Sequence, residues 1–132
     1  MPYELKLATT PRGLAAIVQV GGTLDLRGAP EFDSEIERLL HGDTKEILVD
    51  LHEVEFMDSI GLRSLVAAHR RALRAGVPLW LVRASLPVTQ LLRMTGLDVT
   101  LPLIDELPRR LQGSRPLTVA QRDDMRISSG NM

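Results

Sequence analysis

The chain has 132 residues, of which 44% are hydrophobic and 25% are charged, a balance that favours one folded domain and argues against general disorder. Its formal net charge of −1 gives no sign of nucleic acid or an anionic membrane as a partner, and the lack of cysteine excludes disulfides and thiolate chemistry. Because it has neither an apolar run of membrane-spanning length nor a signal-peptide pattern, we expect a cytoplasmic protein.

The first two predicted elements are strands that pair as an antiparallel hairpin. Residues 3–8 alternate polar and apolar side chains, as an edge strand does, and residues 14–20 form a second strand after a short turn. Pro30 then suits the first turn of a helix, because the N–H group that proline lacks would be unpaired there. Gly42 is a natural end for this helix.

The rest of the chain alternates strands with helices. Strands are predicted at residues 45–51, 77–82 and 99–103, and helices at residues 60–76, 85–96 and 105–111. The pattern predicts an α/β fold, with a mixed, mostly parallel sheet of four or five strands, an N-terminal antiparallel hairpin and about four helices. Residues 1–112 are predicted to form this domain, and the polar residues 113–132 a flexible tail.

The most informative segment is residues 47–62, in which β-forming residues lead directly into a helix. Ser59 is expected at the helix N-terminus, near unpaired N–H groups and the positive end of the helix dipole, a setting that accommodates a phosphate. Asp58 and Ser59 also have a simpler interpretation as a helix cap, and Gly61 as a point of close backbone approach. Spacing alone leaves both interpretations open.

A serine between a strand and a helix also invites comparison with the Gly-x-Ser-x-Gly turn of hydrolases. Here Met57 replaces the first glycine, and the Asp58 carboxylate would repel a developing oxyanion. His69, the one histidine downstream, lies three helical turns away. We therefore expect no enzyme activity and no cofactor, and the three scattered histidines argue against a metal site.

Four motifs resemble those of STAS-domain anti-sigma factor antagonists, also called anti-anti-sigma factors, which are bacterial signalling proteins. They are Gly22-Thr23-Leu24-Asp25, Ala29-Pro30-Glu31-Phe32, Asp58-Ser59-Ile60-Gly61-Leu62 and Leu91-Leu92-Arg93-Met94-Thr95-Gly96-Leu97. They follow the order and spacing of the family and cover about residues 3–110. The sequence departs from the family at Ile60, where the pattern usually has Ser or Thr.

The resemblance implies a partner-switching mechanism. The unphosphorylated protein would bind an anti-sigma factor that is also a serine kinase, and would thereby free a sigma factor. The kinase would then phosphorylate Ser59, and a serine phosphatase would reverse the reaction. The resemblance also gives Asp25 a role in binding or phosphotransfer, beside its ordinary interpretation as a turn-forming residue. Nucleic acid and membrane would not be bound directly, and the protein would be a monomer or a weak dimer.

The predicted partner-binding surface surrounds Ser59. The helical pattern places Arg63, Arg70 and Arg74 in one exposed basic stripe, which is either a solvated face or a contact for an acidic partner. With the resemblance, the predicted set is Asp25, Asp58, Ser59, Ile60, Gly61, Leu62, Arg63 and Arg70. Two alternatives remain open, namely a STAS binding or scaffold module that is not phosphorylated, and a small serine hydrolase.

Overall fold

The computed structural model describes residues 4–112, so the prediction of a flexible tail at residues 113–132 lies outside the described residues. The elements, in chain order, are β1 (Leu5–Arg12), β2 (Ala15–Leu24), α1 (Ala29–His41), β3 (Glu46–Met57), α2 (Ser59–Ala75), β4 (Leu79–Val82), α3 (Leu86–Thr95), the 3-10 helix η1 (Leu97–Val99), β5 (Leu103–Ile104) and the 3-10 helix η2 (Arg109–Leu111).

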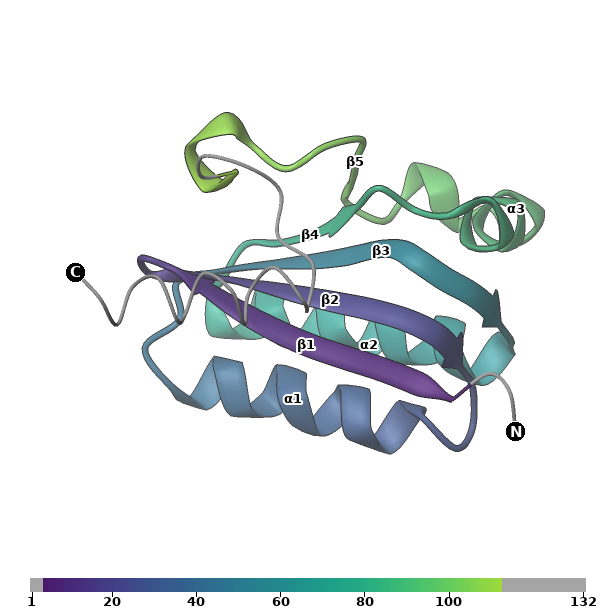
Figure 1. Cartoon of the computed structure of the whole chain (residues 1–132), viewed down its shortest axis with the longest axis horizontal. Helices are drawn as coiled ribbons and strands as arrows, with labels where there is room; N and C mark the ends of the chain where they lie inside the picture. The colour runs from purple at the N-terminus through teal and green to yellow at the C-terminus, as the bar shows by residue number, and fades with distance from the viewer. Residues whose placement is uncertain (1–3, 113–132) are drawn as a thin grey trace, which may run out of the picture.

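Five strands form one mixed sheet in the order β1-β2-β3-β4-β5. β1 pairs with β2 in antiparallel fashion, and β2 to β5 run parallel to one another. The predicted fold class and N-terminal hairpin are therefore confirmed. The C-terminal ends of the parallel strands meet at one edge of the sheet, and the turns into α1, α2 and α3 gather there (Figure 1). Ligand sites of open α/β sheets usually lie at this edge.

The structure differs from the predicted elements in the last third of the chain and in the lengths of the first three strands, since β1 extends to Arg12 and β2 to Leu24. The described residues contain three α-helices rather than about four, because residues 105–111 form only the short η2. Pro108 interrupts this segment, and proline disfavours helical backbone in the residue before it. The strand predicted at residues 99–103 is reduced to Leu103–Ile104, after Pro102. In contrast, the strand predicted at residues 45–51 extends to Met57 as β3.

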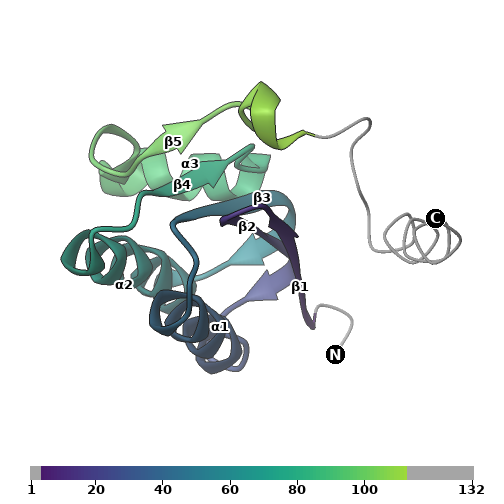
Figure 2. The same ribbon diagram turned by 90° about the vertical axis from the view of Figure 1, so that its left-hand side faces the viewer.

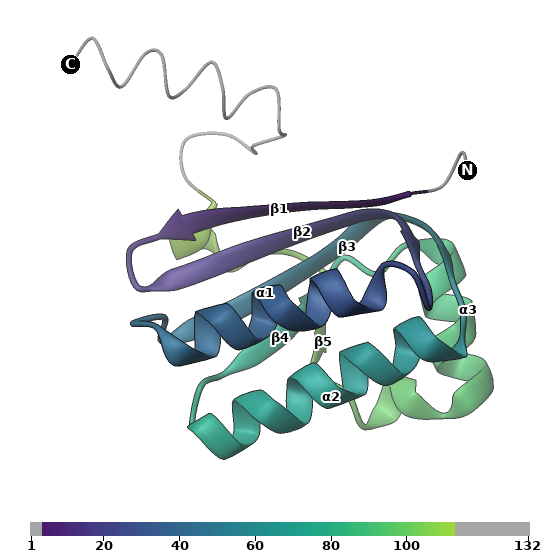
Figure 3. The same cartoon turned by 90° about the horizontal axis from the view of Figure 1, so that it is seen from below.

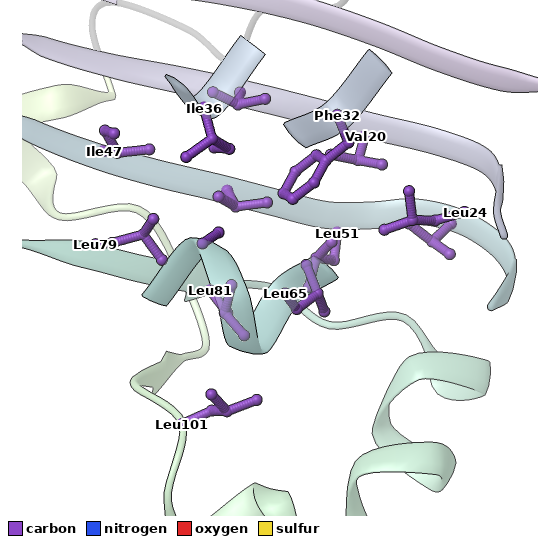
Figure 4. Packing of buried hydrophobic residues seen from close by; sticks show 14 of the residues in the cluster. Val20, Leu24, Phe32, Ile36, Ile47, Leu51, Leu65, Leu79, Leu81 and Leu101 are labelled. Carbon is purple, nitrogen blue, oxygen red and sulfur yellow. The ribbon is translucent and has the colours of Figure 1, made fainter. Parts of the chain in front are cut away.

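The main core lies between the sheet and the helices. α1 and α2 run side by side across one face of the sheet (Figures 2 and 3), and α3 contributes Val88 and Leu92 to the same cluster. Alternate residues of each strand point into this core, for example Val49 and Leu51 of β3. Its side chains are almost all aliphatic (Figure 4), and Phe32 of α1 is fully buried among them.

A second, smaller cluster covers the opposite face of the sheet. It contains Leu48 of β3 and Leu111 of η2, with other short or branched apolar side chains. The Arg110 guanidinium donates two hydrogen bonds of 2.8 and 2.9 Å to the carboxylate of Glu46, which holds η2 against the start of β3. The same contact holds the pKa of Glu46 below its ordinary value. η2 therefore forms a partial cover for this face.

The first turn of α2 packs directly against the end of β2, and Gly61 makes this possible. A Cβ atom at Gly61 would lie 2.0 Å from the carbonyl oxygen of Leu24 and 2.9 Å from Cγ of Met57. No side chain fits at that distance without a shift of the backbone. The missing side chain of Gly61 thus sets how closely the helix start approaches the edge of the sheet.

Gly61→Ala is expected to lower the free energy of unfolding by about 2 kcal/mol in urea denaturation. Overpacking a tight contact costs roughly 3 kcal/mol, whereas the better helix propensity of alanine returns only about 1 kcal/mol. Gly42→Ala is the control, because its Cβ would meet no atom closer than 3.6 Å and its φ is −97°. An unchanged stability of Gly61→Ala would contradict the close approach.

Candidate functional site

Asp58 is the N-cap of α2 and joins this helix to β3. Its backbone is extended, with φ −106° and ψ −172°. Its Oδ1 atom accepts hydrogen bonds from the N–H groups of Ile60 and Gly61, both at 3.0 Å, and its carbonyl oxygen accepts one from Leu62 at 3.0 Å. The capping interpretation is therefore confirmed for Asp58, which satisfies the amide groups that a helix start leaves unpaired.

Ser59 is the first residue of α2, and its side chain is exposed. Within residues 4–112, its hydroxyl makes no hydrogen bond. Because Asp58 already provides the cap, the helix does not need the Ser59 hydroxyl. The position thus combines a hydroxyl without a hydrogen-bond partner in the described chain with exposure to solvent, next to a carboxylate.

Asp25 lies at the same edge, since it follows Leu24, the residue whose carbonyl oxygen approaches Gly61. Its Oδ1 atom accepts hydrogen bonds from the N–H groups of Arg27 at 3.0 Å and Gly28 at 3.3 Å, and it thereby fixes the turn into α1. The turn-forming interpretation is confirmed. A role in binding or phosphotransfer stays a prediction, and the side chain keeps 18% of its surface exposed for it.

Two exposed apolar side chains at this edge were not predicted from the sequence. Leu26, in the turn after Asp25, is 68% exposed, and Phe56, near the end of β3, is 52% exposed. Phe56 is opposite Thr23 of β2, beside a shift in the register of the two strands. In the sequence, Phe56 stands one residue before Met57 and two before the capping residue Asp58. This position at the end of a strand is the signal for an exposed aromatic side chain that the sequence analysis missed. Protein-binding surfaces typically combine exposed apolar area with polar residues at its rim.

The other residues of the predicted surface divide into exposed and buried groups. Arg63 and Arg70 are exposed along α2, and within the described chain neither forms an ion pair. Ile60 is half-buried. Gly61 and Leu62 are buried, so their contribution to a partner surface stays a prediction, while their structural role at the start of α2 is clear.

Within residues 4–112, no histidine or carboxylate side chain is hydrogen-bonded to the Ser59 hydroxyl as a catalytic partner would be. His69 lies on the same helix, about 15 Å further along its axis at 1.5 Å per residue, and it is half-buried. Among residues 4–112, no three His, Asp or Glu side chains are grouped to hold a metal ion. Over the same residues, every helix is too short or too polar to cross a membrane.

Comparisons with known proteins agree with this architecture. Residues 8–107 match the family model described as "Mlab, STAS domain". The anti-sigma-B factor antagonist of Staphylococcus aureus is 30% identical over 94 residues, covering 71% of this chain and 87% of that protein. The anti-sigma-F factor antagonist RsfB of Mycobacterium tuberculosis is 25% identical over 114 residues, covering 86% and 93%.

A solved structure shows the same relation in three dimensions. The crystal structure of an anti-sigma factor antagonist from Mycobacterium paratuberculosis aligns with a TM-score of 0.72 and 28% sequence identity, covering 84% of this chain and 94% of the other. The match to the family model and the structural alignment lead to the same family. The chain belongs to the STAS-domain family, in which these matched relatives are anti-sigma factor antagonists.

Proposed function

We propose that this protein is an anti-sigma factor antagonist, which acts by binding rather than by catalysis. It binds an anti-sigma factor that is also a serine kinase, through the surface around Ser59, and so frees a sigma factor. Phosphorylation of Ser59 by that kinase switches the binding off, and a serine phosphatase restores it. The names of the matched relatives support the partner class.

The observation that carries the proposal is the state of Ser59 at the start of α2. Its side chain is exposed, and within the described residues its hydroxyl is free of hydrogen bonds. A kinase needs a hydroxyl that it can reach without unfolding the substrate, and this one is held on a rigid helix start. Leu26 and Phe56 provide apolar contact area at the same edge.

The Asp58 cap determines what a phosphate on Ser59 would do. Backbone N–H groups at a helix start can bind anions. Here the N–H groups of Ile60 and Gly61 already donate to the Asp58 carboxylate. A phosphate carries about −1.5 to −2 charges at neutral pH, and here it would stand beside a second negative group. It would therefore stay a solvated charge on the surface, and burying it under a partner would be unfavourable through repulsion and desolvation.

Ile60 affects recognition by the kinase more than it affects the fold. The family pattern has a hydroxyl residue at this position, which is suited to capping or to kinase contacts. In this chain Asp58 supplies the cap, so the helix loses nothing with isoleucine there. Ile60 is the residue that favours the second candidate function, a STAS binding module of the same fold that is not phosphorylated.

We expect Ser59→Asp to weaken binding of the cognate anti-sigma factor by at least about 100-fold, and Ser59→Ala to leave it within about threefold. A buried like charge at an interface costs several kcal/mol, and every 1.4 kcal/mol corresponds to about tenfold in affinity. Isothermal titration calorimetry against each anti-sigma factor of the same genome measures both.

Ser34→Asp is the matched control, because Ser34 is also an exposed helix serine but lies on α1 away from the edge. It should bind as the wild type does. Equal affinities of wild type and Ser59→Asp for a partner that binds tightly would contradict the switch and would support the binding module without phosphorylation.

We expect Arg70→Glu to weaken the same complex by about tenfold and to slow its association, because the stripe of Arg63, Arg70 and Arg74 offers exposed cations to an acidic surface. Arg93→Glu makes the same charge change at an exposed position of α3 and should have little effect. Unchanged association rates for Arg70→Glu at low salt would show that the stripe is only solvated.

A further inference from the structure

A cavity of about 210 Å³ lies on the face of the sheet that α1 and α2 leave uncovered. Strand alternation places Thr10 and Arg12 of β1, Ile17 of β2 and Asp50 of β3 on this face, and Leu111 of η2 closes one side. Arg12 and Thr10 belong to the hairpin end of β1, whereas the proposed partner surface lies at the opposite end of β2 and β3. The cavity is therefore separate from the Ser59 edge.

Arg83 is a further polar residue of the cavity lining, which also includes Gln19, Glu106 and Gln112. It follows β4 directly, and regular alternation would place it on the helix-covered face together with Leu81. Its φ is +53°, a left-handed conformation that residues with side chains seldom adopt, and in the described chain it is the only such non-glycine residue. This turn brings the guanidinium to the other face, where Nη2 lies 2.6 Å from Oδ2 of Asp50.

The carboxylate of Asp50, deep in the cavity, already has its partners. Asp50 is 3% exposed, and its Oδ2 atom accepts from Arg83 while its Oδ1 atom accepts from the N–H group of His52 at 3.0 Å. The charges of Asp50 and Arg83 thus compensate each other. The second carboxylate of the lining belongs to Glu106, which is exposed, so a bound cation would find no free carboxylate among the buried residues.

Several donor groups of the lining, in contrast, lack a partner. Within residues 4–112, the Thr10 hydroxyl and Nε of Arg83 are buried and have no hydrogen-bond partner, and Thr10 is only 7% exposed. Arg12 donates a single bond, from Nε to the carbonyl oxygen of Leu111 at 3.3 Å, and no described carboxylate pairs with it. Buried donors without partners are uncommon in folded proteins and call for an explanation.

We propose that this cavity is a binding site for a small organic carboxylate. The carboxylate group of the ligand accepts hydrogen bonds from the unpaired donors of Thr10, Arg12 and Arg83. The hydrocarbon part of the ligand lies against Ile17 and Leu111. An apolar cavity of about 150 Å³ holds a benzene molecule, so the volume here suits a ring or a short branched chain with one carboxylate. Inorganic phosphate would leave the apolar wall without a contact.

The test is a titration of the full-length, isotope-labelled protein with benzoate, followed by amide chemical shifts. Saturable shifts are expected at Thr10, Arg12, Arg83 and Leu111. Benzamide has the same shape without the charge and should bind at least about tenfold more weakly, because hydrogen bonds to charged groups are the stronger ones. Inorganic phosphate at the same concentrations should give no saturable shifts at these residues.

Two threonines of β1 on opposite faces of the sheet provide matched variants. Thr10→Val removes the unpaired hydroxyl, so it should weaken benzoate binding by about tenfold while the midpoint of thermal unfolding is kept or raised. Thr9→Val removes the hydrogen bond from the Thr9 hydroxyl to Glu35 on the helix-covered face, so it should lower that midpoint and leave benzoate affinity unchanged.

Four results would overturn the proposal. The first is the lack of saturable shifts in the full-length protein, the second is equal affinity for benzoate and benzamide, and the third is binding that Thr10→Val does not weaken. Shifts confined to residues around Ser59 would also overturn it, because they would place the carboxylate at the other end of the sheet.

Discussion

The close approach of Gly61 to the carbonyl oxygen of Leu24 determines how the working edge of this protein is arranged. A Cβ atom at Gly61 would lie 2.0 Å from that oxygen, so only glycine lets α2 begin directly against the end of β2. This contact brings two turns with separate sequence origins side by side, the one that Asp25 fixes and the one that Asp58 caps. Ser59 is exposed at this junction because Gly61 and Leu62, on the inner side of the same turn, are buried.

The cap also explains how a modification could act without a change of fold. Asp58 occupies the amide groups of Ile60 and Gly61, so the helix start is complete before any phosphate is added. The proposed switch therefore needs no rearrangement of α2 or of the core between α1, α2 and the sheet. The loss of binding free energy would come from the desolvation of the phosphate when a partner covers it. This loss arises in the complex and not in the isolated domain.

The order of strands and helices and the cap at Asp58 could be predicted because both depend on local patterns of apolar and polar residues. Other features depend on contacts between distant segments and could be predicted only in part or not at all. Close backbone approach is one interpretation of Gly61 in the sequence, but its partner, a carbonyl group 37 positions earlier, cannot be identified from local patterns. The pair of Asp50 and Arg83 forms because a left-handed turn moves Arg83 to the other face. The reduced last strand and the short η2 follow from Pro102 and Pro108, which interrupt weak apolar patterns.

Intact-mass spectrometry shows whether Ser59 is a phosphorylated switch. The protein is incubated with ATP, magnesium and each anti-sigma factor kinase of its genome, with Ser59→Ala and Ser34→Ala in parallel. We expect one added phosphate on the wild type and on Ser34→Ala, and none on Ser59→Ala. Ser59 is not the switch if a kinase forms a stable complex with the wild type but adds no phosphate, or adds it equally to Ser59→Ala.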